Sequence, residues 1–115
     1  MQFKQGASRY VFLIGSYAIK IPRCSAWNLF LHGLLANMQE QTFWQARWVQ
    51  LCPVLFRVPG GFLIVMPRCE PITVPLSRDE YLAFVEQADY TVPVEHKQDS
   101  FGIYQGRLVA IDYGS

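Results

Sequence analysis

Three pairs of short β-rich runs, each pair separated by a turn that contains glycine, constrain the fold of this chain most strongly. The runs lie at 9–13 and 17–21, at 54–58 and 62–66, and at 101–104 and 108–111. Glycine supplies the positive φ that tight turns need, and runs separated by so few residues pair in antiparallel order. The sequence therefore predicts three β-hairpins, and a further strand near Phe3 is expected ahead of the first. Pro22 is expected to end that hairpin's second strand, because proline cannot donate to a ladder.

A long helix is predicted between the first and second hairpins. Ser25 can cap it, and apolar residues then recur at helical spacing from Trp27 to Met38, with Pro53 as the stop signal. The opposite side also carries apolar residues, such as Phe43. We therefore expect the helix to be covered on both faces and to lie inside the fold.

Two further segments complete the element order. The stretch 66–71 contains two prolines and is predicted to be a connector without regular structure. Ser77 followed by Glu80 matches the capping box that begins a helix, here expected to run to about Ala88. The order predicts a single α+β domain in which strands mostly pair with their sequence neighbours.

Composition narrows the classes of partner. The chain has 115 residues, of which 51% are hydrophobic and 17% charged, as expected for one globular domain. Its formal net charge of +1 gives no electrostatic footprint for nucleic acid or for an anionic membrane surface. The longest apolar runs fall far short of the ~20 residues that a membrane-spanning helix needs. We expect neither nucleic acid nor a membrane as a partner.

The cysteines and the first residues of the chain bear on its compartment. Cys24, Cys52 and Cys69 form no C-x-x-C pair, so neither a disulfide framework nor a zinc knuckle is indicated. They are expected to be small buried hydrophobic residues. The first residues lack the apolar stretch of a signal peptide. A reducing cytoplasm is therefore the expected location.

Three charged residues and the element order together resemble the protein-kinase-like fold. Lys20 ends the segment Tyr17-Ala18-Ile19-Lys20, Glu40 follows on the predicted helix, and Asp112 begins Asp112-Tyr113-Gly114 after the last hairpin. In that family a strand lysine holds the nucleotide phosphates, a helix glutamate anchors the lysine, and an aspartate binds the metal. The resemblance implies ATP and magnesium as possible cofactors.

The same resemblance implies an internal division and further site residues. Residues 1–66 would form an N-lobe-like antiparallel sheet with one long helix, 67–76 a hinge-like connector, and 77–115 a terminal β-hairpin in a truncated, vestigial second lobe. Gly6 would belong to the glycine-rich loop, and Met66 would offer its backbone to the nucleotide base. Glu95 would be the candidate catalytic base, and Asp99 a second metal ligand beside Asp112.

The chain also departs from the family pattern. The loop at Gly6 has one glycine in place of three, and Ser100 stands where the family has a metal-binding asparagine. Glu95 stands where the family has an aspartate. The sequence ends one residue after Gly114, where the family continues with an activation segment and a helical lobe. These departures each weaken phosphoryl transfer, which depends on positioning and charge stabilisation around metal-bound phosphates.

Each of the three key residues also has an ordinary structural interpretation. Lys20 can be a solvated lysine at a strand end, Glu40 a solvated residue on a polar helix patch, and Asp112 a turn residue that caps local N–H groups. The kinase-like interpretation makes a spatial prediction instead. The side chains of Lys20 and Glu40 should lie within salt-bridge distance, and Asp112 should face the same cleft.

The departures favour a non-catalytic, pseudokinase-like binding protein that docks on another protein. The stretches 30–37 and 99–114 also resemble small uncharacterised proteins of tailed bacteriophages. That second resemblance implies a host protein as the partner to be modulated, in the host cytoplasm, with self-association as the other possibility. The alternative is a minimal ATP- and magnesium-dependent phosphotransferase, or a nucleotide-binding module without catalysis.

Overall fold

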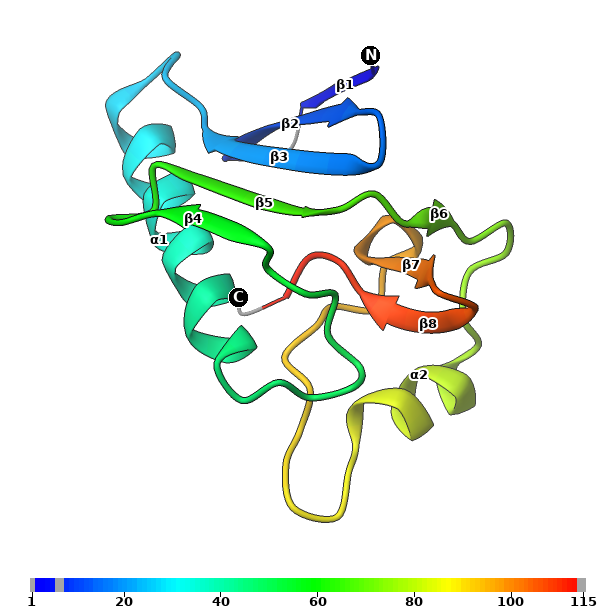
Figure 1. Cartoon of the computed structure of the whole chain (residues 1–115). Helices are drawn as coiled ribbons and strands as arrows, with labels where there is room; N and C mark the ends of the chain where they lie inside the picture. Colours follow the sequence, from blue (N-terminus) through cyan, green and yellow to red (C-terminus); the bar gives the residue numbers. More distant parts are fainter. Residues whose placement is uncertain (1, 6–7, 114–115) are drawn as a thin grey trace.

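The computed structural model describes residues 2–5 and 8–113. Two antiparallel sheets and two α-helices form an α+β fold (Figure 1). The elements, in chain order, are β1 (Gln2–Gln5), β2 (Arg9–Ile14), β3 (Tyr17–Pro22), α1 (Trp27–Trp44), β4 (Phe56–Val58), β5 (Leu63–Pro67), β6 (Glu70–Pro71), α2 (Arg78–Val85), a 3₁₀ turn (Gln98–Ser100), β7 (Phe101–Tyr104) and β8 (Arg107–Ala110).

The larger sheet has five strands in the order β1-β2-β3-β5-β4, and the smaller has three in the order β6-β7-β8. All three predicted hairpins are confirmed, as β2–β3, β4–β5 and β7–β8, and β1 is the strand expected near Phe3. Pro22 is the last residue of β3, as predicted. No described helix is both long enough and apolar enough to cross a membrane.

The register of the first hairpin fixes which side chains share a face. Ile14 pairs with Tyr17 across the two-residue turn, so Val11 lies opposite Lys20 and Arg9 opposite Pro22. Directly opposed residues share a face, and alternate residues of one strand do too. Arg9 and Lys20 therefore lie on one side of the sheet, the side on which α1 packs.

Helix α1 packs against that face with its polar side. Its buried residues are Gly33, Asn37, Glu40 and Gln41, whereas the Trp27 side is open to solvent. A Cβ at Gly33 would lie 2.5 Å from the backbone oxygen of Ser8 and 2.7 Å from Pro22, so only glycine permits this close approach. The prediction of a helix covered on both faces is wrong. The polar side of α1 faces the sheet because it bonds there to the charged side chains of β2 and β3.

Both ends of α1 differ from the prediction. Ala26 is the N-cap and makes no side-chain hydrogen bond there, so Ser25 is not the cap. The helix ends at Trp44, well before Pro53, and Arg47 then adopts a left-handed φ of 57°. The ring of Trp48 stacks on Tyr90 at 4.0 Å, and the next residues hydrogen-bond to Ala110 of β8.

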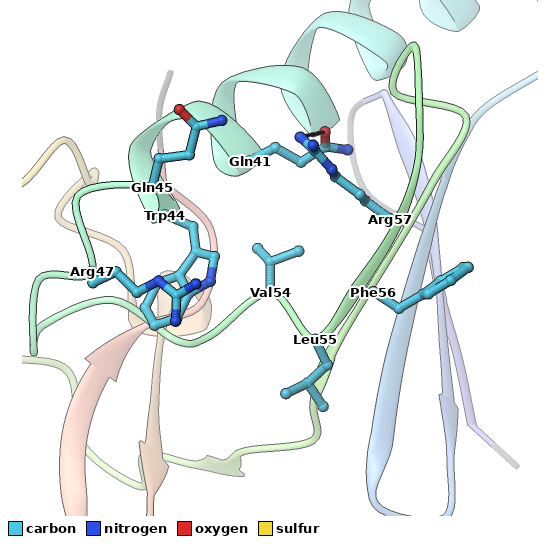
Figure 2. Close-up of a pocket in the computed structure, with 8 residues that line it drawn as sticks. All are labelled: Gln41, Trp44, Gln45, Arg47, Val54, Leu55, Phe56 and Arg57. Carbon is cyan, nitrogen blue, oxygen red and sulfur yellow. Dashed lines mark hydrogen bonds between the residues drawn. The ribbon is translucent and has the colours of Figure 1, made fainter.

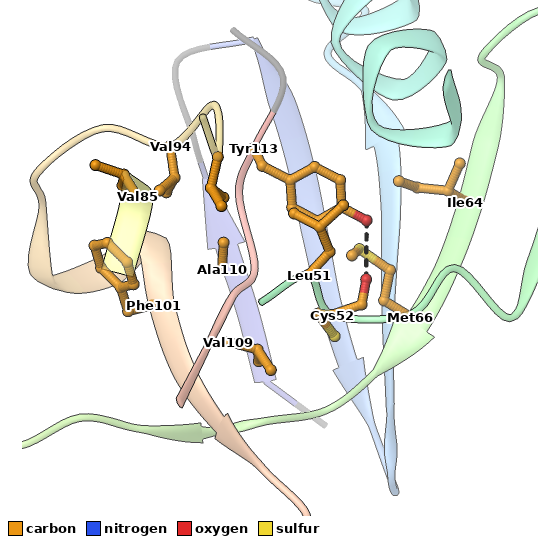
Figure 3. Close-up of a cluster of buried hydrophobic side chains, with 11 residues drawn as sticks. Leu51, Cys52, Ile64, Met66, Val85, Val94, Phe101, Val109, Ala110 and Tyr113 are labelled. Atoms are coloured by element: carbon orange, nitrogen blue, oxygen red, sulfur yellow. Dashed lines mark hydrogen bonds between the residues drawn. The ribbon is translucent and has the colours of Figure 1, made fainter. Parts of the chain in front are cut away.

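The hydrophobic core lies between the two sheets (Figure 3). Leu51, completely buried, forms a parallel bridge with Ala110 of β8, while Ile64 and Met66 face it from β5. Phe101 packs edge-on against Phe84 of α2. The segment that follows α1 therefore joins the large sheet to the small one.

The second half of the chain confirms one prediction and corrects two. The capping box of Ser77 and Glu80 is present at the start of α2, but the helix ends at Val85, before Ala88. Glu70 and Pro71, predicted to lack regular structure, form β6 and pair with β7. An edge strand tolerates proline, because its outward N–H has no ladder partner to lose.

Candidate functional site

Lys20 and Glu40 form a buried ion pair between β3 and α1. The Nζ atom of Lys20 lies 3.1 Å from each carboxylate oxygen of Glu40. Both residues are buried, and Glu40 has no exposed surface. The predicted salt-bridge distance is confirmed, and the interpretations of Lys20 and Glu40 as solvated surface residues are wrong.

Arg9 is a second cation at the same carboxylate, and the sequence analysis missed it. Its Nη1 atom lies 2.5 Å from Glu40 Oε1 and 3.0 Å from Asn37 Oδ1, and its Nη2 atom lies 2.7 Å from Asp112 Oδ1. Arg9 thus bridges the helix glutamate to the aspartate near the C-terminus. Asp112 joins the predicted group through this arginine, and with its side chain 54% exposed it is the member most open to solvent.

Backbone groups after β8 complete the charged cluster, which we define as Arg9, Lys20, Glu40 and Asp112. Lys20 Nζ also donates a hydrogen bond to the carbonyl oxygen of Ile111. The N–H of Tyr113 donates to Glu40 Oε2 at 3.1 Å. The charged cluster therefore holds four segments together: β2, β3, α1 and the chain that follows β8.

Asn37 supports the cluster from one turn earlier on α1. Its side-chain amide donates to the carbonyl oxygens of Lys20, at 3.3 Å, and of Gly61, at 2.8 Å, while its oxygen accepts from Arg9. The spacing of three residues between Asn37 and Glu40 places both on one helix face. This amide therefore fixes α1 relative to β3 and to the β4–β5 turn.

The charges of the cluster neutralise one another: two cations face two carboxylates, so their formal sum is zero. Burial alone would raise the pKa of Glu40, but the charges of Lys20 and Arg9 outweigh it and hold that pKa below its ordinary value. Burial lowers the pKa of Lys20 more than the charge of Glu40 raises it. For Arg9, Glu40 and Asp112 together overcome burial and raise the pKa.

The other predicted site residues are not members of this cluster, although the segment that carries Glu95 and Asp99 runs beside the chain at Asp112: Val94 bridges Tyr113, and the Ser100 carbonyl accepts from the Ile111 N–H. Glu95 is exposed and pairs with Lys97 at 2.9 Å, and Asp99 is exposed in the 3₁₀ turn. The side chain of Met66 is buried in the hydrophobic core, and Gly6 lies outside the described residues. Within residues 2–5 and 8–113, no three His, Cys, Asp or Glu side chains gather in a way that could hold a metal ion.

Arg9 and Asn37 were within reach of sequence reasoning. A two-residue turn at Gly15-Ser16 fixes the hairpin register, and that register places Arg9 two residue pairs away from Lys20, on the same face. Asn37 lies three residues before Glu40, a spacing that puts it on the same face of the helix. The turn length and the helix period therefore assign Arg9 and Asn37 to the faces that carry Lys20 and Glu40.

An open pocket of about 420 Å³ lies between the end of α1 and β4 (Figure 2). It contains none of the predicted site residues. Gln41 and Arg57 meet at its rim, with 3.4 Å between Arg57 Nη1 and Gln41 Oε1. The guanidinium of Arg47 lies over the ring of Trp44, 5.2 Å from its centroid. The pocket is lined by Gln41, Trp44, Gln45, Arg47, Val54, Leu55, Phe56 and Arg57.

The outer side of α1 carries an exposed apolar stripe, which we define as Trp27, Leu31, Leu35 and Met38. Their exposed fractions are 73%, 45%, 49% and 40%. The ring of Phe30 stacks on Trp27 at 5.8 Å and contacts Phe62, which is itself 52% exposed, at 6.2 Å. The apolar stripe therefore extends onto the β4–β5 turn.

Comparisons with protein-family models, with curated proteins and with solved structures find no match.

Proposed function

We propose that this chain is a non-catalytic binding protein of kinase-like architecture, which docks on another protein through the apolar stripe of α1. The observation that carries the proposal is the orientation of that helix. Its polar side is satisfied inside the domain, whereas its apolar side faces solvent. A contiguous exposed apolar surface is typical of a protein interaction site.

The kinase-like part of the proposal is supported by the way charged residues are distributed over the elements. A lysine on β3 pairs with a glutamate on the helix that follows, and an aspartate after the last hairpin joins them through Arg9. The family uses a strand lysine, a helix glutamate and a metal-binding aspartate in this order.

The internal satisfaction of the charged cluster argues against phosphoryl transfer. Beyond its pair with Glu40, Lys20 Nζ donates to the carbonyl oxygen of Ile111, and Arg9 Nη2 donates to Asp112 Oδ1. A lysine that holds phosphates would have to leave the Ile111 carbonyl, and an aspartate that holds magnesium would have to leave Arg9. The alternative function, an ATP- and magnesium-dependent phosphotransferase or nucleotide-binding module, requires that rearrangement.

The partner follows from the geometry of the stripe and from the bacteriophage resemblance. Residues at spacings of four, four and three along one helix offer a narrow apolar ridge that suits the groove between elements of a folded protein. We therefore propose a host protein as the partner. A second copy of the chain is the alternative occupant.

The test substitutes two residues of the apolar stripe, both exposed, so the fold of the domain should be retained. Tagged wild-type chain and the double variant Trp27→Ser/Leu31→Ser are used to capture proteins from host lysate, and Phe56→Ser is the matched control. Phe56 is equally apolar and 60% exposed, but it pairs with Val65 and so lies on the sheet face opposite α1. We expect wild type and Phe56→Ser to retain the same host protein, and the stripe variant to lose it.

Two outcomes would contradict the proposal. Capture that survives the stripe substitutions, while circular dichroism shows all three chains folded, would place docking elsewhere. A wild-type chain that elutes as a dimer from size-exclusion chromatography, and becomes monomeric in the stripe variant, would assign the stripe to self-association.

A further inference from the structure

Two cysteines that are distant in the sequence have their thiols in contact. Cys52 lies between α1 and β4, Cys69 lies between β5 and β6, and their Sγ atoms are 3.5 Å apart. Both thiols also lie near the carbonyl oxygen of Pro67, at 3.8 and 3.7 Å. The contact joins the segment that follows the long helix to the chain that enters the small sheet.

The packing around Cys69 brings it close to Cys52. Gly102 of β7 lies directly against it, and a Cβ at that position would be 2.8 Å from the Cβ of Cys69. A Cβ atom is fixed to the backbone, so it cannot swing aside as the end of a long side chain can. Glycine at position 102 therefore makes the room that Cys69 occupies.

The two thiols differ in access and in acidity. Cys69 is half-buried, whereas Cys52 is buried. The hydrogen bond from the Cys52 thiol lowers the pKa of Cys69, against the effect of burial, and the charges of Lys20 and Arg107 lower it further. The same contact, together with burial, raises the pKa of Cys52. Cys69 is thus the thiol that is better exposed and more readily ionised, which are the properties of an attacking cysteine.

We propose that Cys52 and Cys69 are a redox-active dithiol site, which a low-molecular-weight disulfide such as glutathione disulfide oxidises to an intramolecular disulfide. The Cys69 thiolate attacks one sulfur of glutathione disulfide, forms a mixed disulfide and releases one glutathione thiolate. Cys52 then loses its proton and attacks the Cys69 sulfur, which releases the second glutathione. The protein loses two electrons and two protons, and glutathione disulfide becomes two molecules of glutathione.

The disulfide would add a covalent link next to the charged cluster. The Tyr113 hydroxyl donates to the carbonyl oxygen of Cys52 at 2.9 Å (Figure 3). The Tyr113 N–H donates to Glu40. Oxidation would therefore link the segment at Cys52, which is already hydrogen-bonded to Tyr113, to the chain that follows β5. We expect the oxidised chain to melt several degrees higher than the reduced chain, because a cross-link restricts the unfolded ensemble.

The experiment uses the full chain with Cys24→Ser, which removes the exposed third thiol. The folded variant is incubated with glutathione disulfide, quenched with acid, alkylated in denaturant and mapped by mass spectrometry. We expect the loss of both free thiols and of the mass of two hydrogen atoms, with Cys52 linked to Cys69, and full recovery of both thiols after dithiothreitol.

A companion variant, Cys24→Ser/Cys69→Ser, tests the order of attack. We expect its Cys52 to stay unmodified by glutathione disulfide while the chain is folded, and to react in denaturant. In the Cys24→Ser chain, two alkylatable thiols after incubation, or one glutathione on each cysteine, would overturn the proposal. So would a Cys52–Cys69 link that forms only in denaturant. These readouts need no replacement of the buried Cys52.

Discussion

Glu40 is the residue on which the charged cluster depends, because it contacts both buried cations and the backbone of Tyr113. Breaking a buried ion pair by removing one partner leaves an uncompensated charge, which is far more destabilising than the loss of a surface pair. Single substitutions in the cluster therefore test whether it holds the fold together.

Glu40→Gln should lower the free energy of unfolding by about 3–5 kcal/mol, because Arg9 and Lys20 would then share a buried site with no carboxylate between them. Urea denaturation followed by circular dichroism measures the change. Glu86→Gln, which removes an exposed carboxylate, should change the free energy by less than about 0.5 kcal/mol. Equal effects of the two substitutions would show that the ion pair contributes nothing beyond a surface charge.

Because the pKa of Glu40 is lowered in the folded chain, the free energy of unfolding depends on pH in the acidic range. The carboxylate ionises at a lower pH in the folded chain than its ordinary value of 4.5, so its contribution is complete above that value and is lost as pH falls through the folded pKa. The pKa of Glu80 is also lowered, by hydrogen bonds from Ser77. In a Glu80→Gln background, the urea midpoint should therefore still fall between pH 5 and 3. A flat midpoint across this range would contradict the pKa direction at Glu40.

The pairing of Lys20 with Glu40 could be predicted, because a family resemblance named both residues. Arg9 was missed although the turn at Gly15-Ser16 places it on the same face. The register follows from turn length alone, whereas the bridging of Glu40 to Asp112 depends on the packing of the chain after β8 against α1, which no local pattern encodes.

At the scale of elements, α1 shows what periodicity leaves open. The apolar spacing from Trp27 to Met38 correctly predicted a helix, but a period identifies faces without saying which face meets the sheet. Gly33, together with the polar residues that bond to Arg9 and Lys20, determines which face of α1 packs on the sheet. Hairpins and the capping box were predictable, because their signals lie within a few residues of each other.

Gly33→Ala should destabilise the domain although alanine is the better helix former. Helix propensity favours the substitution by about 1 kcal/mol, but the new methyl group would lie 2.5 Å from the Ser8 oxygen and 2.7 Å from Pro22. Overpacking of this kind typically costs about 1–3 kcal/mol, so the urea midpoint should fall. His32→Ala, at an exposed position on the same helix, should leave it unchanged or raise it slightly. A more stable Gly33→Ala chain would mean that α1 can move away from the sheet.

At the scale of the whole molecule, the two sheets share one hydrophobic core. The charged cluster lies at the edge of this core that is next to α1. Leu51 and Cys52 connect the segment after α1 to Ala110 of β8, and the N–H of Tyr113, which follows β8, donates to Glu40. Both cations of the charged cluster are paired with carboxylates of the same chain, and Arg9 is bonded to Asp112. The charged cluster holds segments of the domain together, and the apolar stripe remains exposed, where we propose that a partner docks.

Thermal unfolding with and without ATP and magnesium tests this account most directly. A ligand at one hundred times its dissociation constant stabilises the native state by about 2.7 kcal/mol, which is several degrees in Tm for a domain of this size. We predict an unchanged Tm at millimolar ATP and magnesium, for the wild-type chain and for Asp112→Asn alike. A rise of several degrees in the wild type, lost in Asp112→Asn, would contradict the account and assign the charged cluster to nucleotide binding.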